Sequence, residues 1–147
     1  MKFNGQLIVN KPQAEVASLF VDPQYLGEYQ DGFVSKTLLE GTEGAVGAKS
    51  KMLYKYGKRD MELTETILAN DLPNSFQGQY HHIHMDNTME CRFIPVDENS
   101  TRFEFDFEYT RINWFMPKLI AILFPSMYKK QGLKWMKQFK EFVESRS

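Results

Sequence analysis

The segment from Arg102 to Tyr109 restricts the fold of this chain more than any other part of its sequence. Aromatic and charged residues alternate along it without interruption. Because successive side chains of a β-strand point to opposite faces of a sheet, the segment predicts a strand with one apolar and one polar face. The apolar face carries Phe103, Phe105, Phe107 and Tyr109. The polar face carries Arg102, Glu104, Asp106 and Glu108. The aromatic face must be covered by another part of the chain.

Turn residues recur at fairly regular intervals between about Phe33 and Arg111. Such spacing is typical of strands that follow one another through hairpins. The expected turns are Gly41 to Gly47, Gly57 to Asp60, Asn70 to Asn74, Asp86-Asn87 and Asp97 to Asn99. They divide the region into six strands. A further strand is expected from about Phe3 to Asn10, where polar and apolar residues also alternate, which gives about seven strands in all.

Two short helices are expected after the first strand. Pro12 suits the first turn of a helix, and Val16, Leu19 and Phe20 then have the spacing of one apolar helix face. This helix should stop before Asp22-Pro23. A second helical turn is predicted from Tyr25 to Tyr29.

The C-terminal segment predicts one long amphipathic helix. Apolar residues and one glycine recur at helical spacing after Pro125. They are Tyr128, Gly132, Trp135, Met136, Phe139, Phe142 and Val143. The opposite face carries Lys129, Lys130, Lys134, Lys137 and Lys140, and we interpret these lysines as the solvated side. The residues from Trp114 to Phe124 are apolar almost all round and do not continue this stripe, so a kink or break is expected near Pro125.

Composition narrows the classes of protein to which the chain can belong. The 147 residues, 42% hydrophobic and 25% charged, predict a single globular domain over 1–147. A net charge of −1 gives no field that would attract nucleic acid. Cys91 is the only cysteine, which indicates a reducing, cytoplasmic location. The longest apolar run, Leu119 to Pro125, is too short for a transmembrane helix, and the N-terminus has no hydrophobic run of signal-peptide length.

Several phrases, taken in order, resemble the SRPBCC superfamily, which includes the START domains, the birch-pollen allergen family and the polyketide cyclase/dehydrase group. These phrases are Val9 to Val16, Leu19 to Pro23, Gly44 to Gly47, Met61 to Ile67 and Trp135 to Lys140. The resemblance implies an α+β helix-grip fold, in which a curved antiparallel sheet wraps around the long C-terminal helix and encloses a hydrophobic cavity. The superfamily has no invariant catalytic signature, so the resemblance does not name a ligand.

The inward faces of the predicted strands and helix define a candidate ligand-binding surface. Strand alternation places Met52, Tyr54 and Tyr56 on one side of one strand and Met89, Cys91 and Phe93 on one side of another. The candidate ligand-binding residues are Met52, Tyr54, Tyr56, Met89, Phe93, Phe103, Phe105, Phe107, Tyr109, Trp135, Met136 and Phe139. A surface rich in Met and aromatic residues would suit an apolar ligand. Alternation alone would be satisfied equally well by a fully packed core.

Two polar residues are weak candidates for acid–base chemistry. Glu65 is in phase with Met61, Leu63 and Ile67, so it would face the apolar side and could move a proton or bind a ligand hydroxyl. We favour the alternative that a bulge or register difference turns Glu65 to solvent. His82 shares a strand face with His84 and could accept a proton at the mouth of a pocket, although a solvated strand explains both histidines more simply. No catalytic residue is assigned.

No metal site is predicted. The three histidines all lie between Tyr80 and His84, and no third ligand or zinc motif accompanies them. Packing is the simplest role for Cys91.

The apolar segment from Trp114 to Phe124 must be covered by something. We expect a lid over the pocket or a homodimer contact in preference to a membrane-touching surface.

Three functions are compatible with these features. The leading hypothesis is a protein that binds or carries a hydrophobic small molecule, lipid-like or aromatic, without a cofactor. An alternative is an enzyme of the polyketide cyclase, dehydratase or hydrolase type, in which Glu65, His82 or a pocket tyrosine moves protons. The third is a co-chaperone-like or toxin-like module that binds another protein through Trp114 to Phe124. The sequence does not decide whether the protein is an enzyme, and we favour the binding protein.

Overall fold

A seven-stranded antiparallel sheet is the main element of the computed structural model, which describes residues 2–112 and 125–146. The strands are β1 (Lys2–Val9), β2 (Phe33–Glu40), β3 (Lys49–Tyr56), β4 (Arg59–Asp71), β5 (Ser75–His82), β6 (Met85–Asp97) and β7 (Ser100–Ile112). Their order in the sheet is β1-β7-β6-β5-β4-β3-β2. Strands β2 to β7 therefore form a meander of hairpins, and β1 pairs with β7. The predicted strand number and the six-strand meander are confirmed.

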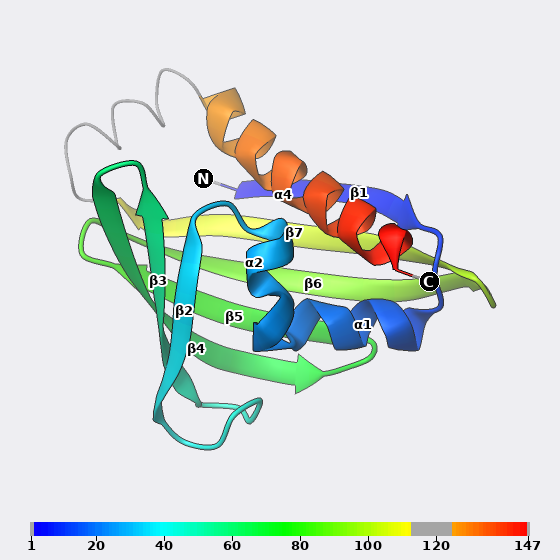
Figure 1. The fold of residues 1–147 in the computed structure, drawn as a ribbon, viewed down its shortest axis with the longest axis horizontal. Coiled ribbons are helices and arrows are strands. Elements are labelled where there is room, and N and C mark those ends of the chain that lie inside the picture. Colours follow the sequence, from blue (N-terminus) through cyan, green and yellow to red (C-terminus); the bar gives the residue numbers. More distant parts are fainter. Residues whose placement is uncertain (1, 113–124, 147) are drawn as a thin grey trace.

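Three short helical elements carry the chain from β1 at one edge of the sheet to β2 at the other (Figure 1). They are α1 (Gln13–Val21), η1 (Pro23–Tyr25) and α2 (Leu26–Tyr29). Helix α1 begins directly after Pro12 and ends before Asp22, as predicted. The Asp22 carboxylate then accepts a hydrogen bond from the backbone N–H of Gln24 at 3.0 Å, which caps η1.

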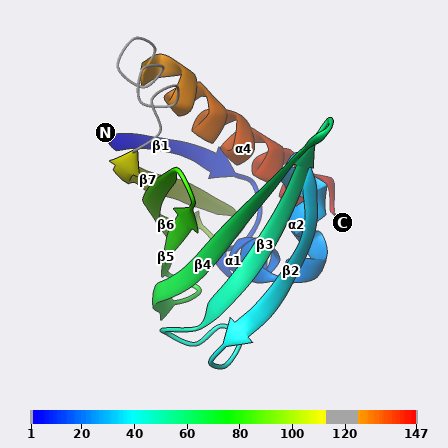
Figure 2. The same cartoon turned by 90° about the vertical axis from the view of Figure 1, so that its left-hand side faces the viewer.

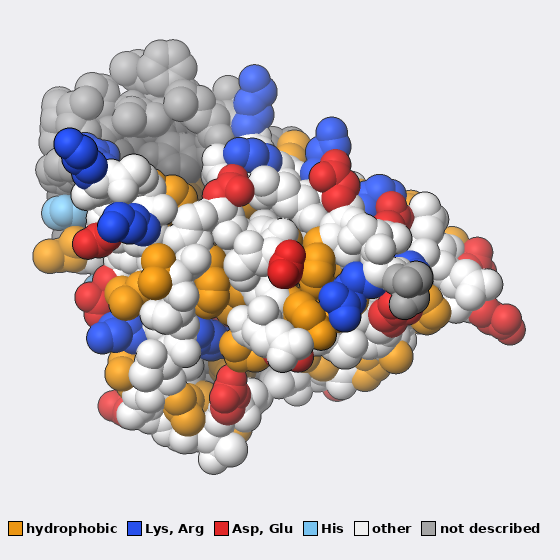
Figure 3. All heavy atoms as spheres, viewed as in Figure 1, with side chains coloured by type: hydrophobic (Ala, Val, Ile, Leu, Met, Phe, Trp, Pro, Cys, Tyr) orange, Lys and Arg blue, Asp and Glu red, His pale blue; other side chains and the backbone are white. Residues whose placement is uncertain are grey.

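The long helix α4 (Pro125–Ser145) begins at the residue where a break was predicted. Its buried face includes Met136, Phe139 and Val143, each at most 4% exposed. Lysines 130, 134 and 137 are exposed, and basic side chains line the edge of the molecule along α4 (Figure 3). The segment from Trp114 to Phe124, with its predicted lid or dimer contact, lies outside the described residues.

The sheet is strongly curved, as the different directions of β2–β4 and β5–β7 show in Figure 2. Helix α4 packs against β1 and α2. The absence of a side chain at Gly5 allows this close approach, because a Cβ atom there would lie 2.6 Å from the Phe105 ring and 2.9 Å from Leu133. The Lys140 ammonium donates a hydrogen bond to the Ile8 carbonyl, and the Asn10 backbone N–H donates to the Glu144 carboxylate at 2.6 Å. These contacts fix α4 along one edge of the sheet.

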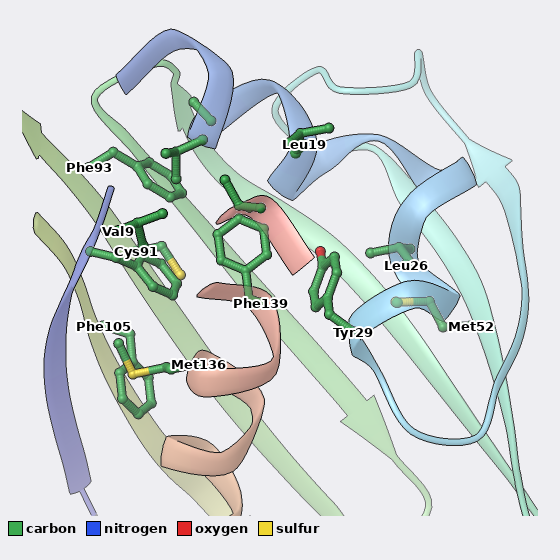
Figure 4. Close-up of a cluster of buried hydrophobic side chains, with 14 of the residues drawn as sticks. Val9, Leu19, Leu26, Tyr29, Met52, Cys91, Phe93, Phe105, Met136 and Phe139 are labelled. Atoms are coloured by element: carbon green, nitrogen blue, oxygen red, sulfur yellow. The ribbon is translucent and has the colours of Figure 1, made fainter. Parts of the chain in front are cut away.

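Aromatic rings fill the space where α1, α4 and the sheet meet (Figure 4). The Phe20 ring centroid lies 5.4 Å from that of Phe93 and 5.6 Å from that of Phe139. Phe93 and Phe103 are stacked at 5.2 Å. In these closely packed pairs Phe93, Phe103 and Phe139 are each at most 3% exposed, which makes this region the firm part of the core.

One hairpin differs from the sequence prediction. The turn between β5 and β6 lies at Ile83-His84, whereas we predicted a turn at Asp86-Asn87. Asp86 stays in the strand because its carboxylate accepts a hydrogen bond from Arg111 of β7 at 2.7 Å. Local turn propensity is thus overridden by a cross-strand ion pair.

Candidate functional site

A cavity of about 790 Å³ lies between the concave face of the sheet and α4. Small-molecule sites in proteins commonly have volumes of about 300–1,000 Å³. The lining comes from all seven strands, the connecting helices and α4, and most of it is apolar. The sheet closes on a single long helix along only one edge, and its curvature leaves the remaining space unfilled.

The structure brings eleven of the twelve candidate ligand-binding residues to this cavity. They are Met52, Tyr54, Tyr56, Met89, Phe103, Phe105, Phe107, Tyr109, Trp135, Met136 and Phe139. Phe93 is the exception: it is 1% exposed and is held between Phe20 and Phe103 in the packed core. That these residues bind a ligand stays a prediction.

Polar residues form a row across the apolar wall of the cavity. Glu65 on β4 is paired in register with Tyr80 on β5, Tyr80 with Asn87 on β6, and Asn87 with Tyr109 on β7. Residues paired in this way project from the same face of a sheet, and all four line the cavity. The row crosses four neighbouring strands and offers hydrogen-bonding groups at several points.

Glu65 is buried in the cavity wall, so our preferred interpretation that it turns to solvent was wrong. It is 5% exposed. The bulge that we considered does occur in β4, but between Ile67 and Ala69, beyond Glu65. The Glu65 carboxylate lies 2.8 Å from the Lys36 ammonium and accepts a hydrogen bond from the Tyr80 hydroxyl at 2.9 Å. These two partners compensate the cost of burying the charge.

Three tyrosine hydroxyls of the cavity lining are protonated donors whose acceptors lie within the protein. Tyr80 donates to Glu65, Tyr54 donates to the Gln30 side chain at 2.7 Å, and Tyr29 donates to the Phe20 carbonyl at 2.8 Å. Burial is the main cause that raises the pKa of all three above the ordinary value for tyrosine, and the negative charge of Glu65 raises each pKa further. Their hydroxyls therefore remain neutral at physiological pH.

Two polar atoms of the cavity lining are buried without a partner among the described residues. They are Asn87 Oδ1, an acceptor, and Trp135 Nε1, a donor. A buried polar atom without a hydrogen bond is costly, and its presence commonly marks a place where a ligand or water completes the bonding.

The histidines do not belong to this site. His82 is the last residue of β5 and His84 lies in the following turn, so the predicted common strand face does not exist. The backbone N–H of His84 donates to His82 Nδ1 at 3.1 Å. Partial burial is the main cause that lowers the pKa of His82, and the neighbouring His84 lowers it further. His82 does not line the cavity, which separates it from Glu65.

The remaining candidates have no chemistry that the described residues support. Over residues 2–112 and 125–146, no cluster of three or more His, Cys, Asp or Glu side chains is arranged to hold a metal ion. Within the same residues, no helix is long and apolar enough to cross a membrane. Cys91 is fully buried, and this burial raises the pKa of its thiol well above the ordinary range.

Sequence reasoning missed Lys36, Tyr80 and Asn87. The alternation of Phe76, Gly78 and Tyr80 along β5 would have predicted that Tyr80 faces inward. Gly78 fits this arrangement, because a Cβ atom there would lie 2.9 Å from the Tyr80 hydroxyl oxygen and 3.2 Å from its ring. Lys36 had no such signal, since register shifts interrupt the pairing of β2 on both sides of it.

Comparison with solved structures identifies the fold. An aromatase/cyclase from a Streptomyces species superposes with a TM-score of 0.80 at 10% identity, covering 99% of this chain and 94% of that chain. A protein from Thermus thermophilus gives 0.77 at 15% identity, covering 100% and 99%. Norcoclaurine synthase from Thalictrum flavum, in complex with dopamine and hydroxybenzaldehyde, gives 0.70 at 14% identity, covering 100% and 88%. No family model matches the sequence, and no curated protein does so.

These likenesses confirm the helix-grip fold that the resemblance to the SRPBCC superfamily implied. Identities between 10% and 15% establish the shared fold alone. Proteins of one fold differ widely in function, so the function has to be argued from the cavity itself.

Proposed function

We propose that the protein binds a largely apolar small molecule in the cavity between the sheet and α4. The observation that carries this proposal is an unfilled volume of about 790 Å³ whose walls are mainly aromatic and Met side chains. Filling such a space with a ligand removes apolar surface from water on both sides, at about 25 cal/mol per Å². The structure of norcoclaurine synthase with two aromatic molecules bound adds support by analogy of fold.

Uptake of the neutral dye Nile red tests the proposal directly. We expect its fluorescence to rise on addition of the protein and to saturate at one dye per chain. Replacing Met89 by Trp should weaken binding at least tenfold, because the larger side chain occupies the cavity that Met89 lines. Thr88→Trp adds the same bulk on the opposite face of β6 and should bind the dye like the wild type. Equal binding by both variants would mean that the dye binds elsewhere. Native mass spectrometry of freshly purified protein would identify a co-purified ligand.

Proton transfer is a second candidate function, and the position of Glu65 favours it. A carboxylate inside an apolar cavity, contacted by an ammonium at 2.8 Å and a hydroxyl at 2.9 Å, can accept a proton from a bound molecule. His82, which we had considered for this role, lies outside the lining. Two of the solved structures with this fold are an aromatase/cyclase and a synthase.

The bicyclic ketone β-tetralone provides a test that does not depend on knowing the substrate. Its α-protons exchange with deuterium when a base removes them, and NMR follows the exchange. We expect the protein to accelerate this exchange, and Glu65→Gln to reduce the acceleration by about a hundredfold or more. Glu62→Gln makes the same change at an exposed position of β4 and should have no effect. If all three proteins exchange at the rate of buffer, Glu65 does not act as a base on ketones of this kind.

A further inference from the structure

Glu65, Tyr80 and Tyr54 present hydrogen-bond acceptors to the cavity. The hydroxyls of Tyr80 and Tyr54 already donate their only proton, to Glu65 and Gln30 respectively. A hydroxyl that donates still has lone pairs to accept another hydrogen bond. Glu65, as a carboxylate, only accepts. A ligand group that reaches Glu65, Tyr80 or Tyr54 therefore meets acceptors and gains most from presenting a donor.

The two unpartnered atoms specify the ligand further. Asn87 Oδ1 needs a donor and Trp135 Nε1 needs an acceptor. A hydroxyl group is able to be either, whereas a carboxylate, a ketone or an ether only accepts. Asn87 lies two strands from Glu65 in the same cross-strand row, so the two acceptors stand roughly 10 Å apart at their backbones. One ligand of the size of two fused rings would reach both.

The charged residues that line the cavity disfavour the binding of an anion. Taken over the described part of the chain, the charged residues of the lining are Lys36, Glu43 and Glu65. Lys36 is the only cation among them, and Glu65 already pairs with it. A carboxylate brought into this space would be desolvated beside Glu65 without a free counter-charge, which is strongly unfavourable.

We propose that the ligand is an uncharged, largely apolar molecule with hydroxyl groups at two separated positions, and that the cavity selects against carboxylates such as fatty acids. This inference rests on the proposed binding function and names the chemical class that the site takes. Asn87 and Glu65 bind the two hydroxyl groups, with Tyr80 between them, and Trp135 donates to a ligand oxygen from α4.

Four naphthalene compounds that share one carbon skeleton test the selection. They are naphthalene, naphthol, a naphthalene diol with hydroxyls on opposite rings, and naphthoate, each competing with Nile red at neutral pH. We expect each hydroxyl to improve binding by about tenfold and naphthoate to bind at least tenfold more weakly than naphthol. The inference is overturned if naphthoate competes as well as naphthol, or if the diol binds no better than naphthalene. Failure of Nile red itself to bind would instead overturn the proposed function, so the two failures are distinguishable.

Variants locate the effect. Glu65→Gln releases Lys36 from its partner and should raise the affinity for naphthoate about tenfold, whereas Glu62→Gln, on the exposed side of β4, should leave it unchanged. Asn87→Leu removes one acceptor at similar volume and should reduce the diol to the affinity of naphthol. If Glu65→Gln failed to fold, Asn87→Leu and the ligand series on the wild type would still decide. Unchanged affinities for the diol in Asn87→Leu and for naphthoate in a folded Glu65→Gln would overturn the assignment of these residues.

Discussion

The space between the sheet and α4 is closely packed in one region, which α1 covers, and open in the other, where the cavity lies. Both regions are lined by aromatic residues. On β7, Phe103 borders the cavity but is only 3% exposed, because its ring contacts both Phe93 and Phe139. Phe107 lies on the same face of the same strand, and it lines the cavity as a half-buried residue. Helix α1 makes the difference, because it packs against β6 and β7 and inserts Phe20 among the rings of the packed end.

The comparison shows that strand alternation encodes the direction of a side chain and not the density around it. The packed end is stabilised by apolar contacts, which do not depend on pH. Polar links hold the strands together at the cavity end: the Lys36–Glu65 pair, the Tyr80–Glu65 hydrogen bond and the Arg111–Asp86 pair. The cavity end should therefore be the part whose stability responds to charge and pH.

Loss of a packed ring gives the largest expected effect. Phe93→Ala should lower the free energy of unfolding by about 3–5 kcal/mol, because it leaves a void among closely packed rings. Phe107→Ala, beside an existing cavity, should cost only about 1–2 kcal/mol. Urea denaturation of both variants measures the difference. Equal losses of free energy would mean that the cavity end is packed as tightly as the region around Phe93.

Breaking the buried ion pair comes next. Lys36→Met should lower the free energy of unfolding by about 2–4 kcal/mol at neutral pH, since it leaves the Glu65 charge without its counter-ion. Adding Glu65→Leu to this variant should recover most of the loss, because neither charge then remains. Lys55→Met, at an exposed position of β3, is the matched control. If the double variant were less stable than Lys36→Met, Glu65 would be stabilised mainly by contacts other than the pair with Lys36.

The Tyr80 hydroxyl should show its effect on the alkaline side. Tyr80→Phe should cost about 1.5 kcal/mol at neutral pH by removing a hydrogen bond to a charged group. Burial is the main cause that raises the pKa of Tyr80, and the charge of Glu65 raises it further. Above about pH 10 the unfolded chain loses this proton while the folded protein keeps it, so the stability of the wild type falls there. The difference from Tyr80→Phe should therefore shrink above pH 10, whereas the loss in Phe93→Ala should stay constant.

The smallest effect concerns the ion pair on the outer face. Asp86→Asn should cost about 1 kcal/mol. The hydrogen bond from Arg111 is the main cause that lowers the pKa of Asp86, and His81 adds to it. The contribution is present above about pH 4, where the unfolded carboxyl is ionised, and it is lost as pH falls through the lowered pKa. The free energies of unfolding of the wild type and Asp86→Asn should therefore become equal as the pH falls from neutral to acid. Glu98→Gln, in an exposed turn, should show no such change.

Most of the fold could be predicted because its signals are local. The bounds of β3 and α1 and the start of α4 follow from alternation, proline positions and helical spacing within short segments. The turn at Asp86-Asn87 was predicted wrongly because its residues favour turns, while the ion pair that keeps Asp86 in β6 comes from Arg111 on the next strand. Local propensity fails where a distant partner outweighs it.

The sequence by itself determined which side chains face the interior, because that depends only on the two-residue period of strands and the spacing of helices. Only the tertiary structure decided whether the interior is filled. The volume left over depends on how far the sheet curves and on where α1 and α4 end, and no single segment carries that information. The burial of Glu65 was also decided by the tertiary structure. Strand alternation directs Glu65 inward, but its carboxylate can be buried only because β2 and β5 bring Lys36 and Tyr80 to it.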